Sequence, residues 1–284
     1  MNDRLCLPRA ETLFQARADR FRQLAQARPA LSGYLSLMAD LSEIQHSLVA
    51  GCADLPLPPP RPGQPPLSIG QRPRQSSWRT LTRTLAERLR PAGAAINDRL
   101  NLIREASDSE LDAWADALLA LDSGAIDAGL APFLFAALQV QWASEAARLE
   151  PSSLTLPETG PHCPACGSLP VASALRTGGA AQGLCYLCCG LCQTQWRRTR
   201  IQCALCGSGE AVSYYGIEGG DAAVKAEACG YCMAYIKRMD REKEPKLDPL
   251  ADDIATLPLD MLMAEAGYAR LGFNPLLLPP GQTP

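Results

Sequence analysis

The cysteines of this 284-residue chain repeat in a fixed register. Eight of the twelve follow the spacing C-x₂-C-x₂₂-C-x₂-C twice, and each cysteine of the first set recurs 40 residues later in the second. Two CxxC pairs can close a tetrahedral S₄ site, because each pair presents two thiols to one side of an ion. The pattern therefore predicts two metal sites, one formed by Cys163, Cys166, Cys189 and Cys192 and the other by Cys203, Cys206, Cys229 and Cys232.

Glycines share this register. Gly167 and Gly207 follow the second cysteine of each first pair, and Gly190 and Gly230 follow the first cysteine of each second pair. Around a thiolate-bound metal the backbone often turns through positive φ so that its N–H groups face the sulfurs. Glycine adopts that conformation without steric cost, so we expect positive φ at these positions.

The first set allows a second ligand assignment. Cys185 and Cys188 form another CxxC pair, which would give an 18-residue spacer if it replaced Cys189 and Cys192. The 40-residue register favours Cys189 and Cys192. The extra pair is then read as buried apolar side chains, or as thiols near the site with a redox or metal-transfer role.

Composition places the chain among folded proteins. Apolar residues make up 47% and charged residues 20%, while the net charge of −3 and the pI near 5.5 favour neither nucleic acid nor an anionic membrane. The sequence has no 18-residue apolar run and no signal-peptide core at its start. We therefore expect a cytoplasmic protein without stable membrane insertion, in which paired cysteines bind metal rather than form disulfides.

Residues 1–158 are predicted to form an all-α domain with its own core. Apolar residues recur every three or four positions in 9–28 and again in 31–50, and Pro29 separates the two helices. The segment 132–149 is too apolar for a surface helix, so we expect it to be buried.

Two local signals divide this helical half. Residues 56–66 contain seven prolines and predict an extended strap. Ser107 and Glu110 have the spacing of a capping box, which predicts a helix that begins at that point.

The second half is predicted to contain two tandem modules, 159–200 and 201–240, followed by a helical tail over 241–284. Glycine and cysteine dominate the modules, and the helical periodicity is lost. About 40 residues bury too little apolar area to fold alone, so each module needs its metal. We expect the tail to pack back on the body, with Asp252 and Asp253 on a solvated helix face.

One patch combines aromatic and basic residues: Trp196, Arg197, Arg198 and Arg200. Residues 161–240 contain seven Lys and Arg against five Asp and Glu, and eight thiolates with two divalent ions would bring the balance from +2 to −2. Binding to phosphates needs a positive potential, so no nucleic-acid partner is expected. The patch is predicted to face a protein partner, or to cover the metal site through cation–π packing on Trp196.

Catalytic motifs are missing from the sequence. It has no GxSxG, no phosphate-binding glycine loop and no HExxH. The two histidines are His46, on a helix face, and His162, which is not expected to be a ligand because four thiols complete the adjacent site. We therefore predict that the protein is not an enzyme.

Several motifs of the second half are those of a known family. They include C-P-x-C-G-S-x-P from Cys163, C-x-L-C-x-T-x-W from Cys189, R-x-x-C-x-x-C-G from Arg200, K-A-E-A-C-G from Lys225 and A-D-D from Ala251. Over 160–276 the chain resembles the FdhE family of formate dehydrogenase accessory proteins. The helical half resembles it more loosely, and Cys185 and Cys188 depart from the family pattern.

The resemblance implies a multihelical N-terminal domain followed by two rubredoxin-like modules. It further implies a cytoplasmic factor that is needed for active respiratory formate dehydrogenase and acts on its catalytic subunit before or during twin-arginine export. The eight cysteines of the register match the family's metal ligands. We expect two Cys₄-bound ions per chain, with iron favoured and zinc as the alternative. A rubredoxin-like electron carrier and a nucleic-acid-binding zinc ribbon are the competing hypotheses.

Overall fold

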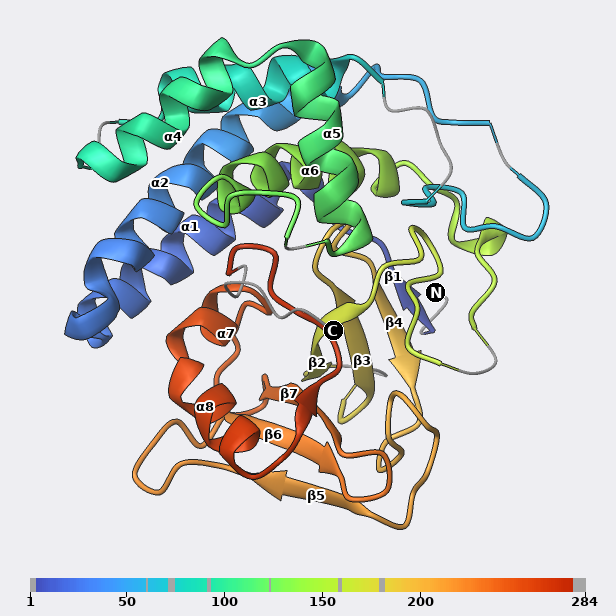
Figure 1. Cartoon of the computed structure of the whole chain (residues 1–284). Coiled ribbons are helices and arrows are strands. Elements are labelled where there is room, and N and C mark those ends of the chain that lie inside the picture. The colour runs from blue at the N-terminus through green and yellow to red at the C-terminus, as the bar shows by residue number, and fades with distance from the viewer. Residues whose placement is uncertain are drawn as a thin grey trace.

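The computed structural model describes residues 4–59, 61–70, 75–90, 93–122, 124–157, 160–178 and 182–277. Helices of the first half of the chain lie together above a sheet that the second half forms, and two short helices lie beside that sheet (Figure 1). No helix in these described ranges has the length and hydropathy that a bilayer crossing requires.

The helical half follows the sequence prediction closely. Its helices are α1 (Ala10–Ala27), α2 (Ser32–Val49), α3 (Ser77–Arg88), α4 (Ala94–Glu105), α5 (Asp108–Ala120) and α6 (Ala131–Ala146). Pro29 lies in the short turn between α1 and α2, and the capping box of Ser107 and Glu110 is formed at the start of α5. All 16 residues of α6 are buried, which confirms that this helix lies inside the protein.

The sheet has eight strands. They are β1 (Leu5–Cys6), β2 (Pro170–Leu175), β3 (Cys185–Cys189), β4 (Gln195–Arg198), β5 (Val212–Tyr215), β6 (Val224–Cys229), β7 (Ala234–Asp240) and β8 (Ala269–Arg270). Seven of them follow the order β1-β4-β3-β2-β7-β6-β5, and β8 pairs with β7. β1 pairs Leu5 with Trp196, so the start of the chain belongs to the sheet and not, as predicted, to an all-α domain.

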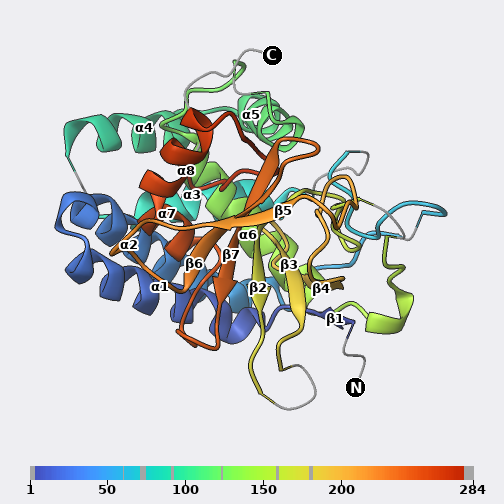
Figure 2. The same ribbon diagram turned by 90° about the horizontal axis from the view of Figure 1, so that it is seen from below.

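Each cysteine repeat forms one antiparallel meander. The first is β2-β3-β4 and the second is β5-β6-β7. The two meanders join because β2 and β7 pair in parallel, with Ser173 opposite Arg238. The repeat therefore builds one continuous sheet rather than two separate modules (Figure 2).

The helical half does not have a core of its own. One continuous cluster of buried apolar residues includes Phe14 of α1, Trp142 of α6, Cys189 of the first repeat, Ile236 of the second and Leu276 of the tail. The core of the helical half is therefore continuous with that of the sheet half, because α6 is buried on every side and is covered by the sheet half as well.

The tail packs back on the body, as predicted. It contains α7 (Ala251–Ala255) and α8 (Leu257–Glu265), which lie between the long helices α1 and α2 and the strand β6 (Figures 1 and 2). Further on, Asn274 donates a hydrogen bond to the Leu250 carbonyl at 2.9 Å, and the Tyr34 hydroxyl of α2 donates to the Leu276 carbonyl.

Two acidic residues of α7 are buried, not solvated as the sequence suggested. Asp252 forms a salt bridge with Arg20 of α1 at 2.6 Å, and Asp253 lies 3.1 Å from Lys237 Nζ of β7. These acidic and basic side chains can be buried together because each charge is paired with an opposite charge. The pairs tie α7 to the helical half and to the second repeat.

Candidate metal centres

The structure brings together the two sets of four thiols that the register predicts. In each set the four sulfur atoms lie within 4.8 Å of one another. We call the set of Cys163, Cys166, Cys189 and Cys192 the first cluster, and the set of Cys203, Cys206, Cys229 and Cys232 the second cluster.

The sulfur spacing fits a tetrahedral ion site. Cys163 Sγ lies 3.5 Å from Cys192 Sγ in the first cluster, and Cys203 Sγ lies 3.6 Å from Cys232 Sγ in the second. A tetrahedron with metal–sulfur bonds of about 2.3 Å has edges of about 3.8 Å, whereas a disulfide bond is about 2.05 Å long. Either cluster could therefore hold one thiolate-bound ion, and all eight cysteines are free thiols.

The CxxC loops, which we call knuckles, confirm half of the glycine prediction. Gly167 and Gly207 have φ of 80° and 75°, as expected for the turn that follows each first pair. Gly190 and Gly230 are not in this conformation; the left-handed residues of the second knuckles are Gln193 and Met233, at φ of 63° and 54°. In each second knuckle, the residue with positive φ is the one after the last cysteine, and these two residues, 193 and 233, are again 40 positions apart.

Gly190 has another role. A Cβ added there would lie 3.2 Å from Cδ of Pro275, which is tighter than ordinary contact. The glycine therefore lets the tail pack directly on the knuckle of the first cluster.

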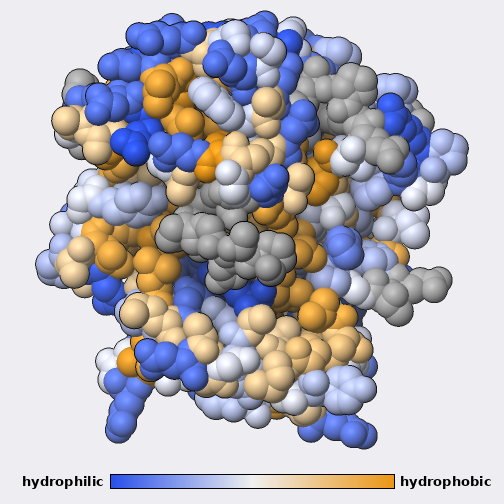
Figure 3. Space-filling model, viewed as in Figure 1, coloured by the Kyte–Doolittle hydropathy of each residue, from blue (hydrophilic) through white to orange (hydrophobic). Residues whose placement is uncertain are grey.

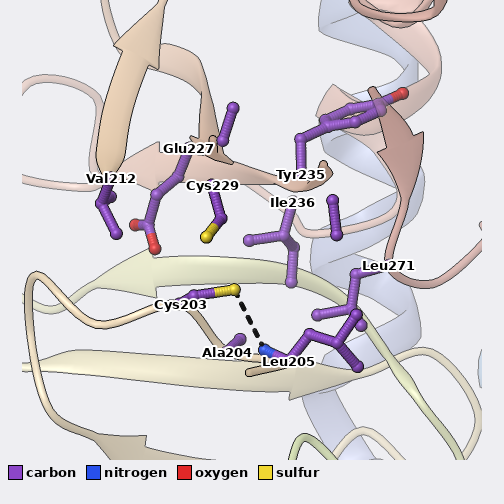
Figure 4. A pocket seen from close by; sticks show the side chains of 11 residues that line it. Cys203, Ala204, Leu205, Val212, Glu227, Cys229, Tyr235, Ile236 and Leu271 are labelled. Carbon is purple, nitrogen blue, oxygen red and sulfur yellow. Dashed lines mark hydrogen bonds between the residues drawn. The ribbon is translucent and has the colours of Figure 1, made fainter. Parts of the chain in front are cut away.

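Backbone amides point at the sulfurs in both clusters. Cys189 Sγ accepts hydrogen bonds from the N–H groups of Leu191 and Cys192 at 3.4 and 3.3 Å. Cys203 Sγ accepts one from Leu205 N–H at 3.4 Å (Figure 4). Such bonds stabilise thiolates, which are the form that binds metal.

The first cluster also has hydroxyl groups that the sequence analysis missed. Ser168 Oγ lies 3.1 Å from both Cys166 Sγ and Cys189 Sγ, and Thr194 Oγ1 lies 3.2 Å from Cys192 Sγ. The signal was available in the quoted motifs, because Ser168 stands two positions after Cys166 and Thr194 two positions after Cys192. In the second repeat, Ala234 takes the place of Thr194 and has no hydroxyl.

The thiols of each cluster differ in acidity. Burial raises the pKa of Cys189, but hydrogen bonds from Cys163, Cys166 and the other surrounding groups outweigh it and hold that pKa well below the usual range. In the second cluster burial again acts upward, yet backbone N–H groups of Cys232 and Tyr231 lower the pKa of Cys229 to about 7. Each cluster thus has one thiol that ionises readily, from which the binding of a cation can start.

The clusters differ most in exposure. All four cysteines of the first cluster are buried, whereas in the second Cys206 is exposed and Cys203 and Cys232 are partly so. A pocket of about 10 Å³ lies beside the second cluster, and Figure 4 shows the sulfur atoms of Cys203 and Cys229 facing each other across it. It has room for about one water molecule at most.

The alternative ligand pair lies outside the clusters. Cys185 and Cys188 are buried on β3 with 2% exposure each. Burial raises the pKa of Cys188 to about 12 and also raises that of Cys185. Protonated thiols are poor nucleophiles and ligands, so the interpretation as buried apolar side chains is favoured. His162 is exposed and does not belong to either thiol group.

The predicted partner patch needs correction. Trp196 is 2% exposed, because its strand β4 lies between β1 and β3 inside the sheet. Arg198 is turned inward and pairs with the buried Glu227 of β6. Only Arg197 and Arg200 of the four residues are exposed, so an aromatic–arginine surface does not form here.

The comparisons with known proteins agree over the whole chain. Three family models match, described as FdhE N-terminal over residues 2–158, FdhE central domain over 162–200 and FdhE C-terminal domain over 201–277. The proteins named Protein FdhE from Salmonella enteritidis and Salmonella typhimurium are each 37% identical over 97% of this chain and 91% of their own length.

A solved structure gives the same result. The crystal structure of the FdhE protein from Pseudomonas aeruginosa superposes with a TM-score of 0.86 at 36% sequence identity, and covers 98% of this chain and 100% of that chain. Because sequence, family models and fold agree from end to end, this chain belongs to the FdhE family.

Proposed function

We propose that the protein is an accessory factor for respiratory formate dehydrogenase, not an enzyme itself. Membership of the FdhE family is the observation that carries this proposal, since it supports an accessory role. The factor would act in the cytoplasm on the catalytic subunit of formate dehydrogenase, before or during export of that subunit.

Each thiol cluster is proposed to bind one metal ion. The support is the sulfur spacing and the N–H groups directed at Cys189 and Cys203. Four thiolates in a tetrahedron suit both iron and zinc. Iron is favoured because the family resemblance implies rubredoxin-like modules, and zinc is the alternative. A bound ion would cross-link the two knuckles of each repeat.

The surface for the catalytic subunit has to differ from the one that the sequence suggested. Four apolar residues around the second cluster are exposed: Ile201 at 57%, Leu205 at 44%, Tyr231 at 78% and Met233 at 41%. Aromatic residues and Met are enriched in protein interfaces, and such side chains gain most from being removed from water. We propose this set, the knuckle surface, as the contact region, with the exposed Arg200 next to it in sequence.

Apolar residues are also exposed away from the knuckle surface, and one of them can serve as a control for it. Hydrophobic residues also gather over α7 and α8 on the face seen in Figure 3. On α8, Met261 and Leu262 are 65% and 47% exposed. On α4, Leu102 is 49% exposed, far from the clusters in sequence, and serves as a matched control.

The test is a binding measurement with the purified catalytic subunit of formate dehydrogenase. Leu205→Ala and Tyr231→Ala should each weaken binding by about 1–2 kcal/mol, which is roughly 5- to 30-fold in Kd. Leu102→Ala should leave Kd unchanged, and metal content should stay the same in all three variants. Full binding by the Leu205→Ala, Tyr231→Ala double variant would exclude the knuckle surface, and no binding by the wild type would exclude the accessory role.

Electron transfer is the second candidate. The exposure of Cys206 favours it, because an iron site at the surface could exchange electrons with a partner. An iron-loaded chain that is coloured and cycles between two oxidation states with a donor, yet binds no catalytic subunit, would support this function instead.

A further inference from the structure

We propose that the two clusters have different roles. The first cluster holds a structural ion that stays in place as long as the chain is folded. The second cluster holds an exchangeable ion that a thiol ligand from outside can reach. This inference rests on the proposed binding of one ion by each cluster, but not on the identity of the client.

The first knuckle of the first cluster is held by the helical half. Leu67 N–H donates to the Ala165 carbonyl at 2.8 Å, and Ile69 N–H donates to the Cys166 carbonyl at 3.1 Å. Trp142 of α6 in turn donates its indole N–H to the Leu67 carbonyl at 3.0 Å. The segment directly after the proline-rich strap thus covers this knuckle and connects it to the central helix α6.

The second knuckle of the first cluster is held equally firmly. Gln139 of α6 donates to the Gly190 carbonyl at 2.6 Å. Arg17 of α1 donates to the side chain of Gln193 at 2.6 Å and pairs with Asp248 at 3.0 Å. A cavity of about 250 Å³ adjoins this cluster at Ser168 and Gly190, but the four cysteines themselves are at most 1% exposed, so a ligand can reach the sulfurs only if the packing around them opens.

The second cluster differs at the corresponding positions. Met233 takes the place of Gln193; its thioether is only a weak acceptor, and it is 41% exposed, whereas Gln193 is buried and bonded to Arg17. The tips of both of its knuckles are exposed, at Leu205 and Tyr231, and Cys206 itself is in contact with solvent. An incoming ligand can approach this cluster without any unfolding.

The burial difference predicts a difference in exchange rate. Reaching a group in the core requires an opening whose free energy approaches that of global unfolding, whereas a surface loop opens at almost no cost. The first ion should therefore leave only when the fold opens. The second should leave at a rate set by ligand exchange.

Cys206 is the ligand that an incoming thiol would replace. With an ion bound, the incoming thiol would give up its proton and bond to the ion, the bond from Cys206 Sγ would break, and the Cys206 thiolate would take up a proton. No electrons are transferred, and the charge of the site is unchanged. Release of the ion would need the same exchange at Cys203, Cys229 and Cys232, and loading would be these four exchanges in reverse.

The experiment uses the full-length chain loaded with two zinc ions. A chromophoric chelator, 4-(2-pyridylazo)resorcinol, reports zinc release, while far-UV circular dichroism is recorded in parallel. We expect two phases of one ion each, the first at least about tenfold faster than the second. The circular dichroism signal should persist through the fast phase and change only with the slow one.

Two variants at equivalent positions of the repeat assign the phases. Cys206→Ser should remove the fast phase and leave one slowly released ion in a folded chain. Cys166→Ser, the same change in the first cluster, should remove the slow phase or prevent folding. Release of both ions in one phase would overturn the inference, as would loss of the helical signal during the fast phase or persistence of the fast phase in Cys206→Ser. A chain that binds fewer than two ions would instead refute the metal binding itself.

Discussion

Replacing Asp253 with alanine tests the buried charge network that joins the tail to the second repeat. Its carboxylate is fully buried, with Oδ1 at 3.1 Å from Lys237 Nζ and 2.5 Å from an Arg270 Nη2. Oδ2 accepts a hydrogen bond from Asn274 Nδ2 at 3.0 Å. Burial acts to raise the pKa of this carboxyl, but Arg270 and Lys237 outweigh it and lower the pKa below its usual value. The group is therefore charged at neutral pH.

The expected cost follows from what the substitution leaves behind. Lys237 has no exposed side-chain surface, and it keeps Asp260 Oδ2 at 2.6 Å and the Asp253 and Thr256 carbonyls at 2.8 and 3.1 Å. Removing one partner of a buried pair costs about 3–5 kcal/mol when the other charge is left unpaired. Because Lys237 stays partly paired, we expect the free energy of unfolding to fall by about 3 kcal/mol, near the lower end of that range.

Urea denaturation followed by circular dichroism measures this difference. The control is Asp19→Ala on α1, where Asp19 is 65% exposed and lies 3.5 Å from Arg22, so that a loss below about 1 kcal/mol is expected. The lowered pKa of Asp253 also determines how stability depends on pH. The contribution of Asp253 to the free energy of unfolding is complete above the pKa of the unfolded chain, about 3.9, and is lost as the pH falls through the lower pKa of the folded protein. A loss no larger than that of Asp19→Ala at pH 7 would refute the reasoning.

Three further predictions follow from single side chains. Metal analysis should find one ion fewer in Cys189→Ser and no change in Cys185→Ser; an empty first cluster in Cys185→Ser would mean that the ligand assignment is wrong. Trp196→Ala should lower the free energy of unfolding by about 3–5 kcal/mol in chemical denaturation, because the indole is buried, and a loss below 1 kcal/mol would contradict that burial. Burial raises the pKa of Tyr34 to about 12, so its stabilising contribution is complete below pH 10 and is lost as the pH rises from 10 to 12. The wild type should accordingly lose stability relative to Tyr34→Phe over that interval in a pH series of unfolding, and parallel curves would contradict this.

Features set by local chemistry were predictable from the sequence. The 40-residue register identified both thiol clusters, since ligand spacing is a property of short loops that holds wherever those loops lie. The capping box at Ser107 and the all-round apolar pattern of α6 likewise depend on neighbouring residues and on helix geometry. The expectation of positive φ failed at Gly190 and Gly230, and the role of Gly190 depends on Pro275, which lies 85 residues further along the chain.

Features set by long-range packing were decided only by the tertiary structure. The parallel pairing of β2 with β7 merges the repeats into one sheet, and no local pattern states which strands of two meanders will meet. Trp196 is buried because the N-terminal strand β1 pairs with β4. Asp252 and Asp253 are buried because α7 packs against Arg20 and Lys237, although the polar or amphipathic character of all three residues suggested the surface. The two clusters have the same ligand spacing, yet one is enclosed and the other exposed. The reason is that spacing fixes the distance between sulfurs, whereas exposure depends on which distant segments pack against the knuckles.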